Sequence, residues 1–324
     1  MAERGRRSTA GPPRRRRQRP RGVEPPSAGG YGEVDLKLPA PPAPLHIPVA
    51  DTHTHIDLQD MEVGAAIAAA ADVGVTPLIQ VGVDLPSSEW GAELAGTTSG
   101  VWATVALHPN HAPRIVHGDT DTWHLGPPRP PGGMAALDAA LTRVGELAAL
   151  PQVRGVGETG LDYFRTGPDG RPAQEHSFRH HIGIAKRHGK ALVIHDRDAH
   201  DDVLRILAET GPPPVVVFHC FSGDAGMAKV CAEHGYYMSF AGTITFSNAQ
   251  PLRDALAVAP IDLLLVETDA PFLTPVPHRG RPNSSYLVPW TVRKMAEVKR
   301  VDEDTMSAAL ARNAERIFGP YESE

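Results

Sequence analysis

The segment VADTHTH, residues 49–55, is a short run of mostly small and apolar residues that ends in two histidines, His53 and His55. Four later segments repeat this arrangement, each with an apolar run that ends at or just before a histidine or carboxylate. They are VRGVGETGLDY at 153–163 with Glu158, ALVIHDRDA at 191–199 with His195, VVVFHCFSG at 215–223 with His219, and LLLVETDAP at 263–271 with Asp269. Short apolar runs are typical of buried strands in a parallel sheet. The repeated ending therefore indicates strands whose carboxyl ends share one site.

From about residue 47 the chain alternates between strand-like and helix-like segments. Eight runs are predicted to be strands: 47–53, 78–83, 101–107, 153–158, 190–195, 214–219, 236–240 and 262–268. Helical periodicity occupies the intervals, for example at 61–74, 89–96, 134–151, 178–189, 201–211, 226–235 and 248–260, and a closing helix is predicted at 306–319. Eight strands alternating with helices favour a (β/α)8 or TIM barrel. An open doubly wound sheet is the alternative, but no G-x-G-x-x-G motif follows the first strand.

Composition limits the class of protein. A chain of 324 residues with 41% hydrophobic content can bury one α/β barrel or two ordinary domains. No apolar run of about 18 residues exists, so we expect no membrane span. No apolar stretch follows the Arg-rich start, so a secretory signal is not expected. Two cysteines are too few for a disulfide framework and fit a reducing compartment, which predicts a cytoplasmic protein.

The first residues differ in composition from the rest. Residues 1–22 hold nine Arg and one Glu, a local charge of +8 in a chain of net charge −6, which leaves −14 for the remainder. We predict that residues 1–46, rich in Arg, Pro and Gly, are a disordered tail, and that 47–320 form the barrel. A solvated tail is the favoured interpretation. Contact with nucleic acid and a later translation start, for instance at Val34, are the alternatives.

The residues at the strand ends suit metal chemistry. Residues two apart in a strand point to the same side, so His53 and His55 can face one ion. Glu158, His195, His219 and Asp269 end other strands, and in a parallel barrel all of these would meet around one mouth. Four histidines and two carboxylates suit one or two divalent cations. A carboxylate between two ions would let them share one water molecule, whose lowered pKa supplies hydroxide for hydrolysis, with Asp269 orienting that water or taking its proton.

Five ordered motifs carry a family resemblance: D-T-H-T-H-I-D at 51–57, G-E-T-G-L-D-Y at 157–163, V-I-H-D-R-D-A at 193–199, H-C-F-S-G at 219–223 and E-T-D-A-P-F-L-T-P at 267–275. A-L-H-P at 106–109, P-H-R-G at 277–280 and R-N-A-E-R-I-F-G at 312–319 add to them. The chain resembles the TatD family of metal-dependent deoxyribonucleases from about residue 49 to residue 319. The resemblance implies a TIM barrel of the amidohydrolase type that cleaves DNA with divalent metal, often as a 3′-to-5′ exonuclease.

Carried over motif by motif, the resemblance implies two ions, with Mg, Mn and Zn as the candidates. His53, His55, Glu158 and Asp269 would bind one ion, and Glu158, His195 and His219 would bind the other. Glu158 would bridge the two, and Asp269 would act as general acid or base. A carbamylated lysine bridge, as in phosphotriesterase relatives, would need Lys at the end of the fourth strand, where this chain has Glu158.

The family pattern also implies contacts to substrate. His108 would contact substrate or a bound phosphate, and Arg197 and Arg279 would pair with phosphate unless they form structural salt bridges instead. Among aromatic residues that follow strand ends, we expect at most one to stack on a base. These residues are Tyr163, Phe164, Phe221 and Phe272. In the proline-rich insertion before the helix at 134–151, we expect surface roles for His111, His117 and His124.

We therefore predict a metal-dependent hydrolase with a deoxyribonuclease activity on single strands or strand ends, and we favour a monomer. Hydrolysis of another ester or amide on the same barrel is the alternative. A less favoured hypothesis is a non-catalytic protein that binds nucleic acid through its Arg-rich tail. The acidic body favours attraction of phosphate by bound cations over attraction by a Lys/Arg surface.

Overall fold

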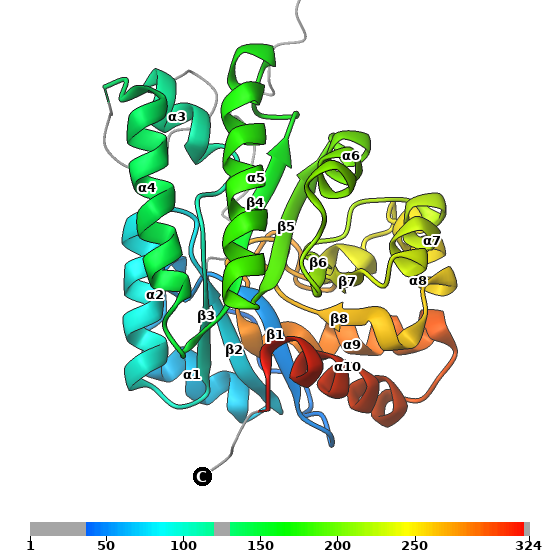
Figure 1. The fold of residues 1–324 in the computed structure, drawn as a ribbon. Coiled ribbons are helices and arrows are strands. Elements are labelled where there is room, and N and C mark those ends of the chain that lie inside the picture. The colour runs from blue at the N-terminus through cyan, green and yellow to red at the C-terminus, as the bar shows by residue number, and fades with distance from the viewer. Residues whose placement is uncertain (1–36, 120–129, 321–324) are drawn as a thin grey trace, which may run out of the picture. The chain divides into compact units, whose positions relative to one another are not determined.

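The computed structural model describes residues 37–119 and 130–320, and these form the barrel (Figure 1). Eight parallel strands form one sheet in the order β1-β2-β3-β4-β5-β6-β7-β8. Each strand overlaps one of the eight predicted runs, so the TIM barrel prediction is confirmed. The strands are β1 (Val49–Thr54), β2 (Val75–Val81), β3 (Val101–Val105), β4 (Val153–Asp162), β5 (Ala191–Arg197), β6 (Val216–Phe218), β7 (Tyr237–Phe240) and β8 (Leu264–Val266).

Helices follow the strands and cover the outside of the sheet, with α2, α4 and α5 side by side along one flank (Figure 1). Several helices begin with a capping acid: in α2, for instance, Asp84 accepts the Ser87 N–H and Ser87 reaches back to the Asp84 N–H. The helices are α1 (Val63–Ala71), α2 (Leu85–Thr97), α3 (His111–His117), α4 (Gly133–Ala148), α5 (Arg171–His188), α6 (His200–Thr210), α7 (Ala225–Glu233), α8 (Gln250–Val258), α9 (Val288–Lys299) and α10 (Glu303–Phe318). Of these, α3 and α9 lie outside the predicted helical stretches.

The barrel closes between its first and last strands through backbone bonds just beyond β8. The Asp269 N–H donates to the His53 carbonyl at 2.9 Å, and the His55 N–H donates to the Ala270 carbonyl at 2.9 Å. Thr54 and Ala270 form a parallel bridge. This seam lies at the carboxyl end of the strands, which we call the mouth. The two strands that carry His53, His55 and Asp269 are therefore joined at the position where those side chains project.

The opposite end of the barrel is filled by apolar side chains. Ile317 and Phe318, at the end of α10, pack with strand residues that form a cluster separate from the layer between strands and helices. The strand residues come from five strands and include Ala50, Ile79, Val193, Val217 and Leu265. The candidate ligands lie at the other end, the mouth, where TIM barrels hold their active sites.

The predicted domain boundary at residue 46 is wrong, because residues 37–46 pack on the barrel. Leu45 is buried, and its N–H donates to the Val73 carbonyl at 3.0 Å. The Tyr286 hydroxyl donates to the Pro39 carbonyl at 2.7 Å, and the Arg293 guanidinium donates to the Ala43 carbonyl at 2.8 Å. Composition did not reveal this, because backbone carbonyls provide most of these contacts. Residues 1–36 of the predicted tail lie outside the described residues.

No helix in the described part of the chain is both long and apolar enough to cross a bilayer.

Candidate metal centre

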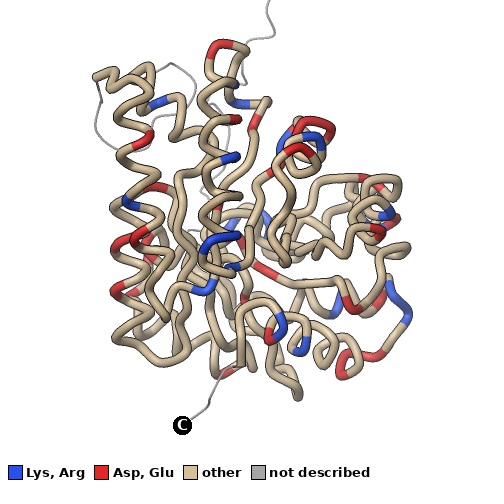
Figure 2. The backbone as a smooth tube through the Cα atoms, viewed as in Figure 1, with Lys and Arg blue, Asp and Glu red and all other residues tan. Residues whose placement is uncertain are grey.

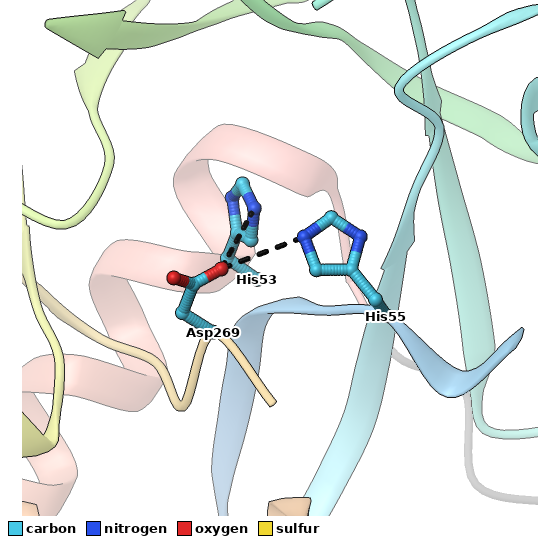
Figure 3. A group of neighbouring side chains, drawn as sticks. All are labelled: His53, His55 and Asp269. Atoms are coloured by element: carbon cyan, nitrogen blue, oxygen red, sulfur yellow. Dashed lines mark ion pairs between the residues drawn. The ribbon is translucent and has the colours of Figure 1, made fainter. Parts of the chain in front are cut away.

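The first and last strands provide one half of the candidate site. His53 lies in β1, His55 follows that strand, and Asp269 lies three residues beyond β8. Asp269 Oδ1 lies 3.7 Å from His53 Nε2 and 3.5 Å from His55 Nε2, and Figure 3 shows these two contacts converging on one carboxylate oxygen. Asp269 has a φ of 54°, the left-handed region that aspartate enters more readily than most residues. Its N–H bond to His53 holds it in this conformation beside the histidines.

Glu158 lies at the centre of the cluster. It occupies the middle of β4 rather than its end, because this strand continues to Asp162. The register of β4 and β5 shifts between Val156 and Thr159, and such irregularities re-aim side chains near active sites. The Glu158 oxygens lie 3.4 Å from His53 Nε2, 3.9 Å from His55 Nε2, 3.3 Å from His108 Nε2, 2.7 Å from His195 Nδ1 and 2.9 Å from His219 Nε2. One buried carboxylate thus reaches every predicted histidine ligand.

The ligand atoms are close enough to share cations. Three sets each bring their ligand atoms within 4.8 Å of one another: His53, His55 and Asp269; His53, Glu158 and His219; and His108, Glu158 and His195. Among the described residues, neither ring nitrogen of the buried His53 has a hydrogen-bond partner. A buried polar group without a partner is costly, and a cation would supply the missing interaction. Imidazole nitrogens and carboxylate oxygens together suit Zn and Mn, and carboxylates suit Mg, so the residues present fit divalent cations.

The same crowding determines where protons lie. Burial alone would raise the pKa of Glu158, but the His219 and His108 imidazoles outweigh burial and hold the pKa well below its usual value. Burial alone would lower the pKa of His219, but the carboxylates of Glu158 and Glu267 raise it well above its usual value. A proton on His219 thus balances these carboxylates. A cation that binds this nitrogen must displace that proton.

Two further carboxylates orient the histidines and were missed from the sequence. Glu267 is fully buried, and its Oε1 lies 3.2 Å from His219 Nδ1 and accepts the Cys220 N–H at 2.8 Å. Asp162 Oδ2 lies 3.3 Å from His195 Nε2 and accepts from Asn110 Nδ2 at 2.8 Å. Such partners fix the ring orientation of metal-binding histidines. Glu267 follows the apolar run of residues 263–266, which marks it as a strand-end acid, but its contact with His219 could not be read from that pattern, and Asp162 follows no apolar run.

The predicted substrate contacts lie in different places. His108 lies inside the cluster, with its ring 4.5 Å from that of His195. Arg197 ends β5, and its guanidinium lies 4.0 Å above the Phe164 ring. Arg279 stacks on Phe246 at 4.4 Å, in a loop beyond β8, and the described residues give it no contact with the six predicted ligands. The structure thus brings His108 to the ligands and leaves Arg279 apart from them.

The expectation for the insertion was wrong for one histidine. His111 is buried at the start of α3, with its Nδ1 3.9 Å from Asp84 Oδ2. It is buried because α3 packs against α4 and α5, which the sequence pattern did not indicate. His117 is exposed as expected, and His124 lies outside the described residues.

A TIM barrel with buried imidazoles and carboxylates gathered at its mouth defines the class of metal-dependent hydrolases. Residues 50–319 match the family described as TatD related DNase. The chain belongs to the TatD family, and the resemblance stated from the motifs is confirmed.

Individual relatives agree with this assignment. An uncharacterized metal-dependent hydrolase, TatD, from Mycobacterium tuberculosis is 39% identical over 279 residues, which cover 84% of this chain and 98% of that protein. The uncharacterized metal-dependent hydrolase YabD of Bacillus subtilis is 32% identical over 271 residues, covering 83% and 98%. The crystal structure of YjjV, a TatD homologue from Escherichia coli K12, superposes with a TM-score of 0.72 at 27% identity and covers 84% of this chain and 98% of that one.

Proposed function

We propose that this hydrolase is a divalent-metal-dependent deoxyribonuclease that cleaves phosphodiester bonds, working from the 3′ end of single strands or frayed duplex ends. The main support is the position of Glu158, whose oxygens lie 3.9 Å or closer to five imidazoles beside the group of His53, His55 and Asp269. A carboxylate shared by two cation positions suits in-line displacement at phosphorus, where attacking and leaving oxygens both need stabilisation. The family description, TatD related DNase, supports the same substrate.

In this proposal His53, His55 and Asp269 would hold one cation, His195 and His219 would hold a second, and Glu158 would contribute to both. Divalent cations bound there would polarise the phosphoryl oxygens and lower the pKa of a nearby water molecule. The protein itself holds these side chains in position and shields them from bulk water. The side chains of Glu158 and His219 are only 5% and 4% exposed, which keeps bulk water away from the shared carboxylate.

His108 is assigned a different role, as a hydrogen-bond donor. Its Nδ1 accepts the Asn110 N–H at 3.1 Å, so the lone pair of that nitrogen is occupied. A neutral imidazole then carries its proton on Nε2, the atom that lies 3.3 Å from Glu158 Oε1. Burial lowers the pKa of His108 to about 4, which keeps the ring neutral near pH 7. His108 therefore suits contact with a phosphoryl oxygen better than ligation of a cation.

Two residues at the edge of the cluster complete the proposed chemistry. The Asp269 side chain is 17% exposed, against 5% for Glu158, so Asp269 is the carboxylate that can exchange a proton with solvent. Arg197 forms no ion pair within the described residues, which leaves its guanidinium available to phosphate. Figure 2 shows Lys and Arg interspersed with Asp and Glu along the described chain rather than gathered in a basic stripe. This distribution favours a protein that binds DNA through bound cations rather than through a long basic groove.

The test is digestion of a short single-stranded oligonucleotide labelled at its 5′ end, with Mg, Mn or Zn added to metal-free protein. We expect a ladder of products shortened from the 3′ end. Asp269→Asn and Glu158→Gln should abolish it. Asp138→Asn is the matched control, since it removes a carboxylate from an exposed group with His176 and His180 on the outer helices α4 and α5. Its activity should equal that of wild type.

The result that overturns the nuclease is the absence of product with all three metals while the protein hydrolyses a small ester or amide. The same oligonucleotide also tests the hypothesis that the protein binds nucleic acid through its Arg-rich tail without catalysis. If deletion of residues 1–36 abolishes DNA binding while Asp269→Asn and Glu158→Gln leave the protein's effect on DNA intact, the cluster is not the functional site.

A further inference from the structure

The four aromatic residues that follow strand ends differ in exposure and in the contacts of their rings. Phe221 is buried, and Tyr163 is covered by the Arg171 guanidinium at 3.9 Å and donates its hydroxyl to Asp202. Phe164 and Phe272 are exposed, at 62% and 51%. One face of Phe164 is already occupied by Arg197. Among the described residues, Phe272 is therefore the candidate whose ring is exposed and not covered by a cation.

Phe272 lies directly beside the proposed metal ligands. It follows Asp269 by three residues, and its N–H donates to the Asp269 carbonyl at 2.9 Å. Its ring centroid lies 6.4 Å from that of His55, with the two rings at 68°. This distance corresponds to about two base steps of stacked nucleic acid, which rise about 3.4 Å each. The ring therefore lies close enough to contact a base beside a phosphate held at His55 or Asp269.

The backbone that carries the exposed ring is held in place by its loop. Asn283 donates through Nδ2 to the carbonyls of Phe272 and Thr268, at 2.5 and 3.1 Å, and the Asn283 N–H donates to the Pro271 carbonyl at 3.2 Å. Asn283 is itself buried. A phenyl ring on a fixed backbone offers a flat apolar face, and little backbone entropy is left to lose on binding.

We propose that Phe272 is a stacking platform for the unpaired base next to the phosphate that is cut. This inference rests on the proposed deoxyribonuclease function and specifies its substrate. Aromatic stacking accepts any base, because every base has a π face, so the platform confers preference for unpaired nucleotides rather than for sequence. In a duplex the bases are stacked on one another and their faces are covered. Cleavage would therefore require a single strand or a frayed end.

The experiment compares two single-stranded oligonucleotides that differ only at the 3′ end, one of normal nucleotides and one with abasic residues there. For wild type, Phe272→Ala, Phe272→Leu and Phe272→Tyr, kcat and KM are measured with each. We expect Phe272→Ala and Phe272→Leu to raise KM for the normal strand about 5- to 150-fold, the effect of losing one stacked base. Phe272→Tyr should keep wild-type values, and all four proteins should treat the abasic strand alike.

Val258→Ala is the matched control, because Val258 is an exposed apolar residue at the end of α8. It should match wild type on both strands. Equal KM values for Phe272→Ala and wild type on the normal strand would overturn the stacking role while leaving the nuclease intact. An equal loss on both strands would also overturn it, since the ring would then support the metal ligands rather than a base. If wild type cleaves neither strand, the proposed nuclease function is wrong, and the stacking role of Phe272 is then wrong as well.

Discussion

Replacing Glu267 by glutamine should weaken metal binding about tenfold without changing the fold. Glu267 is fully buried, with its Oε1 3.2 Å from His219 Nδ1 and 2.8 Å from the Cys220 nitrogen. Glutamine has the same length and keeps an acceptor oxygen, but it removes the charge that makes the His219 ring a stronger base. A hydrogen bond to a charged group contributes about 1.5–3 kcal/mol and a neutral one about 0.5–1.5 kcal/mol. A difference of about 1.4 kcal/mol corresponds to a tenfold change, at the lower end of the 10–100-fold range for such partners.

The assay is titration of metal-free protein with Zn or Mn in competition with a chromophoric chelator at constant pH. Circular dichroism establishes that the variant is folded. Asp262→Asn is the control, because Asp262 is an exposed carboxylate just before β8, and its affinity should stay at the wild-type value. A folded Glu267→Gln protein that binds metal as tightly as wild type would refute the reasoning, because the buried carboxylate would then contribute nothing to the His219 ligand.

Three other predictions concern stability. A chelator should lower the Tm of the metal-loaded protein, because a ligand present at about 1,000 times its Kd stabilises the folded state by about 4 kcal/mol. A Glu158→Gln protein whose Tm still rises with metal as much as that of wild type would contradict this. Leu45→Ala should reduce the free energy of unfolding in urea by about 2–4 kcal/mol, because Leu45 is only 5% exposed, and an unchanged value would mean that residues 37–46 do not stabilise the barrel. Burial lowers the pKa of His181 to about 4, and its Nε2 accepts the Leu107 N–H, so the folded protein holds this ring neutral. The stability that the neutral ring contributes is fully present above the ordinary pKa of 6.5 and falls by about 3 kcal/mol as the pH drops towards 4. The free energy of unfolding of metal-free His181→Gln should therefore fall less steeply with acid than that of wild type. Equal slopes for the two proteins would count against this role of His181.

The barrel could be predicted because its strands are buried on both faces. Such strands appear in the sequence as nearly continuous apolar runs, and Leu264–Val266 of β8 is an example. The boundary of the ordered chain could not be predicted in the same way. Residues near Pro39 and Ala43 are held through their carbonyl oxygens, and a carbonyl oxygen is the same in every residue.

The convergence of the candidate ligands followed from topology, since parallel strands of a barrel bring their carboxyl ends to one mouth. The position of Glu158 in the middle of its strand could not be predicted, because the extension of β4 to Asp162 depends on a register shift that involves a neighbouring strand. Glu267 was missed for a related reason. Its role depends on facing His219, which is 48 residues away in sequence, and local pattern does not report a contact of that range.

The seam of the barrel and the candidate metal centre use the same residues. The amide of Asp269 joins β8 to β1 through His53, while the carboxylate of Asp269 faces the imidazoles of His53 and His55. Any opening of the barrel at this seam would separate candidate ligands of one cation, and a cation bound there would link the two ends of the eight-stranded sheet. Release of the ion and opening of the barrel would then be one coupled event, and the conformation of the barrel would depend on whether the candidate metal centre holds its cation.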